Sequence, residues 1–83
     1  MEIETVILED KKEYAIVDTI EIEEVKYLYL GELEELQSED DIMPTVVIRK
    51  LDKKEKNILG LETEEEYKMA LETFVNKWNK ENS

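Results

Sequence analysis

The chain has 83 residues, of which 41% are charged and 41% hydrophobic, and it contains no histidine and no cysteine. A chain of this length has room for one small domain and not for two. The lack of histidine and cysteine excludes Ser–His and thiolate nucleophiles, disulfide bonds and cysteine-based zinc sites. The net charge of −12 disfavours direct contact with nucleic acid or anionic lipid.

The charge is distributed unevenly along the chain. Residues 1–45 carry 15 acidic and 3 basic side chains, whereas residues 46–83 carry 8 of each, so the whole net charge lies in the first half. A one-sided acidic field steers association toward basic surfaces. We therefore expect a non-enzymatic module that binds a protein partner with a basic surface, and we expect no cofactor.

The N-terminal residues do not have the pattern of a targeting sequence. Residues 1–4 alternate apolar and acidic side chains, without the basic start and apolar stretch of a signal peptide. No apolar run approaches the roughly 18 residues that a membrane-spanning helix needs. We therefore expect a cytoplasmic protein that does not enter a membrane.

Two strands are predicted near the start of the chain. Residues 3–8 are apolar and β-branched and end at a polar turn, and residues 14–22 alternate for much of their length. In the second strand Asp18 shares the parity of the apolar residues, which are Tyr14, Ile16, Ile20 and Ile22. An aspartate on that parity indicates a β-bulge near Asp18–Thr19 or an edge position.

A third strand is predicted at residues 25–30, with its two tyrosines on one face and its two leucines on the other. Glu23–Glu24 before it is short enough for a hairpin turn, although it lacks the glycine or asparagine that such turns favour. Residues 32–41 contain six acidic residues and are interpreted as a solvated loop or a single helical turn. A fourth strand is predicted at residues 45–51.

A C-terminal helix is predicted at residues 64–80. Thr63 and Glu66 have the spacing of a capping box, in which Thr63 accepts from the amide of Glu66 and Glu66 reaches back to the amide of Thr63. Apolar residues then recur at helical spacing along one stripe, which we expect to be core. The stripe consists of Tyr67, Ala70, Leu71, Phe74 and Trp78.

Together these elements predict an α+β fold, with a four-stranded antiparallel sheet packed on one C-terminal helix and residues 1–83 forming a single domain. The strands are joined by short or polar links, which favour antiparallel pairing. The apolar stripe of the helix needs an apolar surface to cover, and one face of the sheet supplies it.

The abundant carboxylates do not form a recognisable catalytic or metal site. Asp18 is interpreted as a bulge or edge aspartate bonded to backbone and not as a catalytic group, because no partner base is identifiable. Residues 38–41 could collect Ca²⁺ or Mg²⁺ weakly, but they lack the ligand spacing and glycine of an EF-hand loop. We therefore predict no catalytic residue and no metal ligand.

The tyrosines have two interpretations. If Leu28 and Leu30 face the helix, Tyr27 and Tyr29 line the open face of the sheet, where tyrosines bordered by acids would form a binding surface. The alternative is ordinary packing between neighbouring strands. The predicted interaction residues are three tyrosines and five acidic residues: Tyr14, Tyr27, Tyr29, Glu34, Glu35, Glu39, Asp40 and Asp41.

Five segments, ETVILED (4–10), YAIVDTIEI (14–22), KYLYL (26–30), VVIRK (46–50) and LETEEEYKMAL (61–71), carry a resemblance to a known family. In their order and content the chain resembles the YrzB-like family of small acidic proteins of Gram-positive bacteria, a domain of unknown function. Members tend to have a glycine in the turn where this chain has Glu23–Glu24. The resemblance implies a cytoplasmic bacterial protein without an assigned activity, and it transfers no catalytic or binding residue.

Two functions are compatible with these observations. The first is a protein-interaction module whose acidic half steers it to a basic partner, or which binds a second copy of itself as a homodimer. The alternative is a nucleic-acid mimic, such as a phage-type inhibitor of a basic nucleic-acid-binding enzyme. The acids are spread over turns and not set in a double row, which favours the first function over the second.

Overall fold

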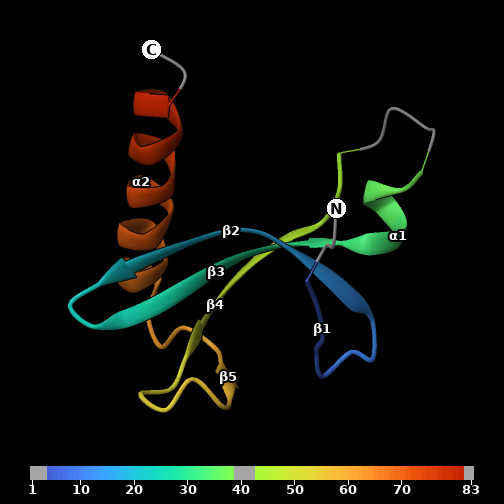
Figure 1. The fold of residues 1–83 in the computed structure, drawn as a ribbon, viewed down its shortest axis with the longest axis horizontal. Coiled ribbons are helices and arrows are strands. Elements are labelled where there is room, and N and C mark those ends of the chain that lie inside the picture. Colours follow the sequence, from blue (N-terminus) through green and yellow to red (C-terminus); the bar gives the residue numbers. More distant parts are fainter. Residues whose placement is uncertain (1–3, 39–42, 82–83) are drawn as a thin grey trace.

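The computed structural model describes residues 4–38 and 43–81, which form an antiparallel sheet with a long helix on one face (Figure 1). The elements in chain order are β1 (Thr5–Ile7), β2 (Glu13–Ile22), β3 (Val25–Glu32), α1 (Leu33–Leu36), β4 (Val46–Leu51), β5 (Ile58–Leu59) and α2 (Glu64–Glu81). The predicted α+β class and the C-terminal helix are confirmed. No helix in the described part of the chain is long and apolar enough to cross a membrane.

The sheet has five strands, so the prediction of four was wrong. Its order is β1-β2-β3-β4-β5, and every neighbouring pair is antiparallel. The additional strand, β5, pairs only with Lys50 and Leu51 of β4. A strand of two residues is too short to show alternation, which is why the sequence pattern did not reveal it. Of the two interpretations of residues 32–41, the single helical turn is present as α1.

The turn between β2 and β3 has an unusual backbone for its residues. Glu23 and Glu24 have φ angles of 48° and 68°, and the flanking Ile22 and Val25 pair with each other. Two successive left-handed residues make the type I′ turn that suits a hairpin, and this turn usually contains Asn-Gly. Each non-glycine residue held in this region strains the backbone by about 1–2 kcal/mol.

A β-bulge in β2 switches the alternating side chains from one face of the sheet to the other. Ile16 pairs with Leu30 and Asp18 pairs with Tyr29, so Val17 has no residue opposite it. The extra residue reverses the alternation. The bulge therefore lies one residue before its predicted position, and it places Asp18 on the face that carries α2.

Each face of the sheet has its own core. In Figure 1, α2 lies on one side of the sheet and β1 and β5 lie on the other. The core beneath α2 contains Tyr27, Ile48, Ala70 and Phe74, with Tyr29 and Trp78 packed against it. The opposite core contains Leu8, Tyr14, Leu28 and Leu30, with Val6 of β1 and Ile58 of β5. Both terminal strands thus curl under the same face.

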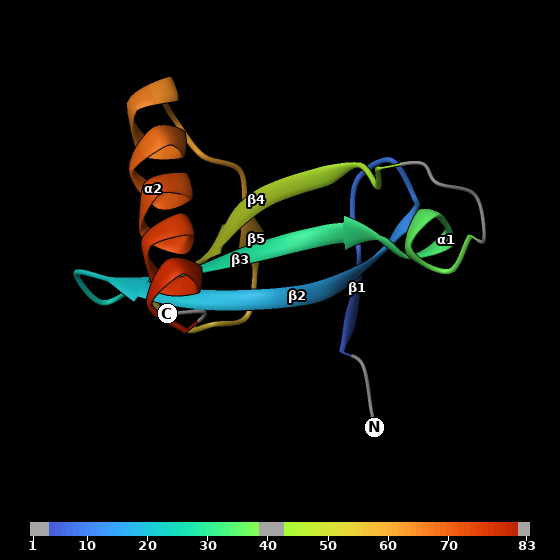
Figure 2. The ribbon, with the colours of Figure 1, turned by 90° about the horizontal axis from the view of Figure 1, so that it is seen from above.

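The helix α2 runs across the strands and not along them (Figure 2). It starts as predicted, because the Glu66 amide donates to Thr63 Oγ1 at 3.0 Å. The carboxylate of Glu66, however, accepts from the amide of Glu62 at 2.8 Å and not from that of Thr63. The beginning of α2 lies at β4, where Glu66 meets Lys50, and its last turns lie at β2, where Lys77 meets Asp18.

Candidate interaction surface

Of the two interpretations of the tyrosines, the structure agrees with packing, and an open tyrosine face is not formed. Tyr27 and Tyr29 face α2, whereas Leu28 and Leu30 belong to the opposite core, so the orientation that a tyrosine binding surface required is reversed. Tyr14 is also buried, on the side away from α2. Both faces of β3 are apolar, so the alternation in the sequence does not determine which face meets the helix.

The ring of Tyr29 is part of an aromatic cluster with α2. Its centroid lies 5.4 Å from that of Phe74 and 4.9 Å from that of Trp78, both in edge-to-face geometry. Such pairs add about 0.5–1.5 kcal/mol beyond their buried area. Tyr29 is therefore a packing residue in the structure.

The hydroxyl of Tyr14 donates to Asp10 Oδ2 at 2.7 Å. This hydrogen bond, together with burial, raises the pKa of Tyr14 to about 12. The bond connects β2 to the turn that precedes it. Tyr14 thus has a structural role in the core formed with β1.

The structure describes two of the five predicted acidic residues, Glu34 and Glu35, and both lie on α1. Glu34 is exposed on α1. Glu35 accepts hydrogen bonds from the backbone N–H and the hydroxyl of Thr45, and the backbone bond holds the pKa of Glu35 below its usual value. Glu35 thereby connects α1 to the chain entering β4. Glu39, Asp40 and Asp41 lie outside the described residues.

The sequence did not predict that Glu32 would be buried. Only 6% of its surface is exposed, and burial together with the nearby Glu35 carboxylate raises the pKa of Glu32. Lys12 lies 3.8 Å away and opposes this change. The pair of carboxylates resembles an acid–base arrangement, but Glu35 is already bonded to Thr45.

Asp18 holds the last turns of α2 against the sheet. Its Oδ1 accepts from the Thr19 amide at 2.8 Å and from Lys77 Nζ at 2.6 Å, and its Oδ2 accepts from Trp78 Nε1 at 2.6 Å. Burial of Asp18 acts to raise its pKa, but the bonds from Lys77 and Trp78 outweigh burial and lower it. The predicted backbone bond is confirmed, and its two helix partners were not foreseen.

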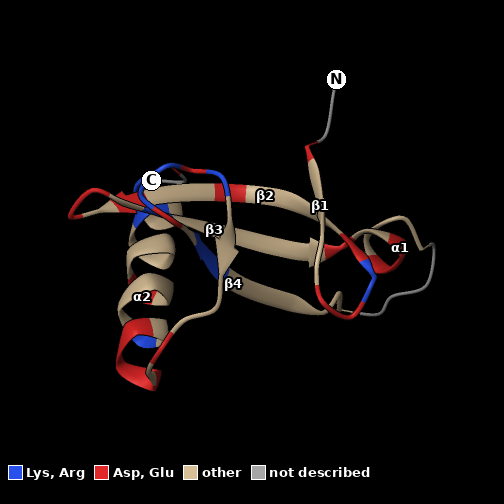
Figure 3. Cartoon of the chain, turned by 90° about the horizontal axis from the view of Figure 1, so that it is seen from below, with Lys and Arg blue, Asp and Glu red and all other residues tan. Residues whose placement is uncertain are grey.

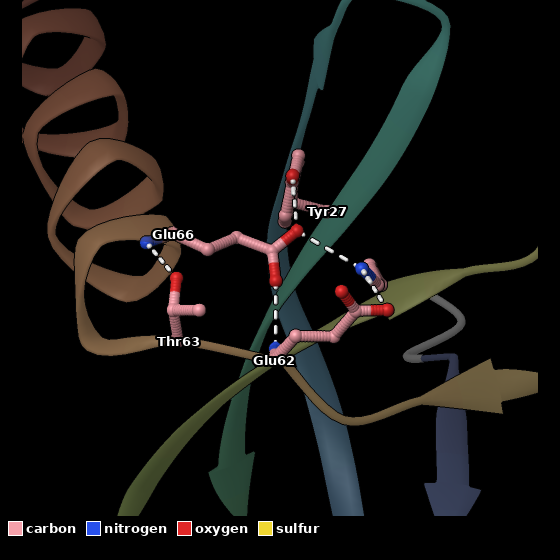
Figure 4. Close-up of polar contacts among 5 residues, drawn as sticks. Tyr27, Glu62, Thr63 and Glu66 are labelled. Carbon is pink, nitrogen blue, oxygen red and sulfur yellow. Dashed lines mark hydrogen bonds and ion pairs between the residues drawn. The ribbon is translucent and has the colours of Figure 1, made fainter.

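Glu66 has the corresponding role at the start of α2 (Figure 4). Besides the Glu62 amide, its carboxylate accepts from the Tyr27 hydroxyl at 2.9 Å and from Lys50 Nζ at 3.0 Å. The bond from the Glu62 amide, with those from Lys50 and Tyr27, keeps the pKa of Glu66 low. Burial and the bond to Glu66 raise the pKa of Tyr27 to about 12. The capping pattern located Glu66, but its partners come from two different strands.

Exposed acidic residues are concentrated in turns and at the start of α2 (Figure 3). Glu23 and Glu24 form the tip of the β2–β3 hairpin, Glu34 lies on α1, and Glu64 and Glu65 lie in the first turn of α2. No three acidic side chains within residues 4–38 and 43–81 come together as a metal-binding group. The weak cation site considered at residues 38–41 falls largely on residues that are not described.

An open groove, absent from the predicted sites, lies between β4 and the start of α2. Its volume is about 400 Å³, and it is lined by Val46–Arg49 on one side and by Leu61–Glu64 with Tyr67 on the other. Tyr67 was expected to be core, but it is 43% exposed. The first turns of α2 lie on the β4 side of the sheet. They extend beyond the paired strands there and leave Tyr67 uncovered.

Comparison with known proteins places this chain in a family. The model of the family described as "Protein of unknown function (DUF1292)" matches residues 9–77, which extend from the β1–β2 turn into the last turns of α2. No curated protein and no solved structure shows a significant match. The expectation of an uncharacterised family is confirmed, and the chain belongs to the DUF1292 family of proteins of unknown function.

Proposed function

We propose that this protein is a non-enzymatic interaction module that binds a partner protein through a basic surface of that partner. The observation that carries the proposal is the excess of exposed acids without a nearby cation. Ion pairs among the described residues engage only five acidic residues, Glu9, Asp18, Glu32, Glu62 and Glu66. The remaining excess creates a field that attracts a basic partner and accelerates encounter.

The ionisable groups with altered pKa values support a non-enzymatic role. Catalytic groups need a free proton-transfer position beside a bound substrate. Asp18 and Glu66 instead have both carboxylate oxygens engaged by protein donors, and these donors hold α2 on the sheet. The lowered pKa values of Asp18 and Glu66 are therefore explained by their structural roles.

The proposed setting is the cytoplasm of a Gram-positive bacterium, where the module would meet soluble partners. The resemblance to the YrzB-like family supports this part of the proposal. A homodimer is the less favoured form of the interaction, because two copies with a net charge of −12 repel each other.

The test is an affinity pull-down of the tagged chain from lysate of its own host, treated with nuclease and eluted with a salt gradient. A matched pair of variants separates location from total charge. Glu21→Gln with Glu34→Gln removes two exposed acids of the first half, and Glu72→Gln with Glu81→Gln removes two from α2. We expect the first pair to elute a bound basic protein at lower salt and the second pair to leave its elution unchanged.

Three results would contradict the proposal. Equal effects of the two variant pairs would show that total charge, and not an acidic surface, governs retention. Recovery of copies of the chain alone would replace the proposal by self-association. A nucleic-acid-binding enzyme that is displaced by competing DNA or RNA would replace it by nucleic-acid mimicry.

A further inference from the structure

We infer that the free edge of β4 at Val46–Ile48 is a docking site for an extended basic segment of the partner, which adds a sixth strand to the sheet. The inference rests on the proposed function, because it specifies where and how the basic partner binds. Strand addition of this kind uses backbone hydrogen bonds for affinity and alternate side chains for specificity.

The backbone of β4 points its hydrogen-bonding groups outward at Val46 and Ile48. The Glu32 amide donates to the Thr45 carbonyl at 3.0 Å, so Thr45 faces β3. Groups alternate along an antiparallel strand, so those of Val46 and Ile48 face away from β3. The bond from the Asp52 amide to the Asn57 carbonyl, toward β5, agrees with this alternation.

The strand β5 stops short of these outward groups. It covers Lys50 and Leu51 and ends there, so no described strand pairs with the outer edge of Val46–Ile48. Arg49 Nη1 donates a long hydrogen bond to the Ile48 carbonyl at 3.5 Å, which an added strand would replace. An edge of this kind is a template for another strand.

The first turns of α2 extend over the position that an added strand would occupy. The groove beside this edge is bounded by Leu61–Glu64 and by Tyr67 of α2. Tyr67 belongs to the helix stripe that includes the buried Ala70 and Phe74, yet it is 43% exposed. An added strand would lie beneath Tyr67 and give this ring the contact that β3 and β4 give to Phe74.

Charge determines which occupant fits. The wall of the groove carries the exposed carboxylates of Glu64 and of Glu62, which is 83% exposed although it lies 3.9 Å from Lys50 Nζ. Arg49, the cation lining the groove, is paired with Glu9 at 3.0 Å. The site therefore favours a segment with apolar residues toward Val46 and Tyr67 and with lysine or arginine toward the acidic wall.

A second copy of this chain fits the same edge poorly. Antiparallel pairing of two β4 edges around a two-fold axis would bring the Glu62 and Glu64 walls of both copies close together. Each copy also carries a net charge of −12. The repulsion favours a basic partner over self-pairing.

The experiment uses a phage-displayed library of linear peptides of about 12 residues, long enough for one added strand, selected on the full-length chain. Selected peptides are synthesised, and their affinities are measured by calorimetry. Amide hydrogen exchange is then measured with and without peptide. We expect peptides rich in lysine or arginine with alternating apolar residues, and slowed exchange at Val46 and Ile48 when they bind.

Two variants at one position separate backbone pairing from side-chain contact. Val46→Pro removes an outward N–H that β3 does not use, a change that edge strands tolerate. Val46→Ala keeps the N–H and shortens a side chain that is 37% exposed. We expect Val46→Pro to weaken peptide binding at least about tenfold, as the loss of one or more hydrogen bonds requires, and Val46→Ala to weaken it less than about threefold. Thermal unfolding checks that both variants remain folded.

The outcomes distinguish this inference from the function on which it rests. Peptides that bind Val46→Pro as well as the wild type, or that leave the Val46 amide unprotected, would overturn the β4 site and leave the proposed function intact. A library that yields no peptide, while a basic partner is still retained in the pull-down, would overturn strand addition alone. Loss of the basic partner in the pull-down would overturn both.

Discussion

Several side chains in this protein have structural roles that the sequence pattern did not predict. Tyr29 illustrates this, because its ring packs against both Phe74 and Trp78 and does not lie on an open surface. A residue whose ring packs in this way contributes mainly to stability. A residue on an interaction surface would instead contribute to binding.

Substitution of Tyr29 tests this assignment. Tyr29→Ala is expected to lower the free energy of unfolding by about 2–4 kcal/mol, because it leaves a cavity beside Phe74. Tyr29→Phe is the control, since no hydrogen bond of the hydroxyl is present among the described residues, and its effect should stay within about 0.5 kcal/mol. Urea unfolding followed by far-UV circular dichroism measures both. A Tyr29→Ala protein as stable as the wild type would restore the surface interpretation.

Asp18 predicts a specific pH dependence of stability. Its folded-state pKa is below the ordinary value, so its contribution is present above about pH 4 and is lost as the pH falls through the folded-state pKa. Asp18→Asn should therefore reduce the free energy of unfolding by about 1–3 kcal/mol near neutral pH, where charged hydrogen bonds are lost. The difference from wild type should shrink as the pH falls through the folded-state pKa of Asp18.

Urea titrations of both proteins across this pH range, followed by Trp78 fluorescence, provide the measurement. Glu21→Gln is the matched control, because Glu21 is an exposed acid on the same strand. Its effect should be small at every pH. A difference between Asp18→Asn and wild type that does not change with pH would mean that shape, and not charge, anchors Trp78.

At the scale of elements, the β2–β3 hairpin carries backbone strain at its tip. Glu23 and Glu24 both have positive φ angles, which glycine adopts without a steric cost. Glu24→Gly is expected to raise the free energy of unfolding by about 1 kcal/mol. Glu24→Ala removes the same charge but keeps the strain, and it should give little or no gain. Equal gains in the two variants, measured by urea unfolding, would assign the effect to charge.

The two ends of α2 are attached to the sheet by similar chemistry. The Glu66 carboxylate accepts hydrogen bonds from Tyr27 and Lys50 at the start of the helix. The Asp18 carboxylate accepts hydrogen bonds from Lys77 and Trp78 near its end. In each case one carboxylate binds donors from another element. Between these anchors, Ala70 and Phe74 are fully buried. The helix is thereby held across the strands while its first turns remain over the groove.

The radius of gyration of the whole molecule is larger than that of a compact chain of the same length. Its radius of gyration is 13.2 Å, compared with about 12 Å for a compact chain of this size. The projecting hairpins and the overhanging helix account for this difference (Figure 1). Many acidic residues lie on these projections, which increases the distances between like charges.

Self-repulsion among these acids predicts that salt stabilises the protein. Raising NaCl from about 10 mM to about 500 mM shortens the screening length below the spacing of most surface charges. The thermal midpoint should therefore rise, and it should rise less in the variant with Glu21→Gln and Glu34→Gln. Calorimetry at both salt concentrations measures the change. A midpoint that falls with salt would show that the five ion pairs outweigh the repulsion.

Much of the fold could be predicted because it depends on local patterns. The apolar and alternating segments, the polar turns between them and the cap at Thr63 are properties of neighbouring residues, and they located four of the five strands and α2. The interruption of the pattern at Asp18 also predicted the bulge within one residue. The expectation of a domain of unknown function agrees with the DUF1292 match over residues 9–77.

Only the tertiary structure decided which face of the sheet meets the helix. Tyr27 with Tyr29 and Leu28 with Leu30 alternate equally well in either orientation, because a strand with two apolar faces has no preferred side. The helix crossing, the curl of β1 and β5, and the partners of Asp18 and Glu66 depend on contacts between distant residues. The groove at β4 has the same origin, since it arises where α2 extends beyond a strand that β5 leaves partly unpaired.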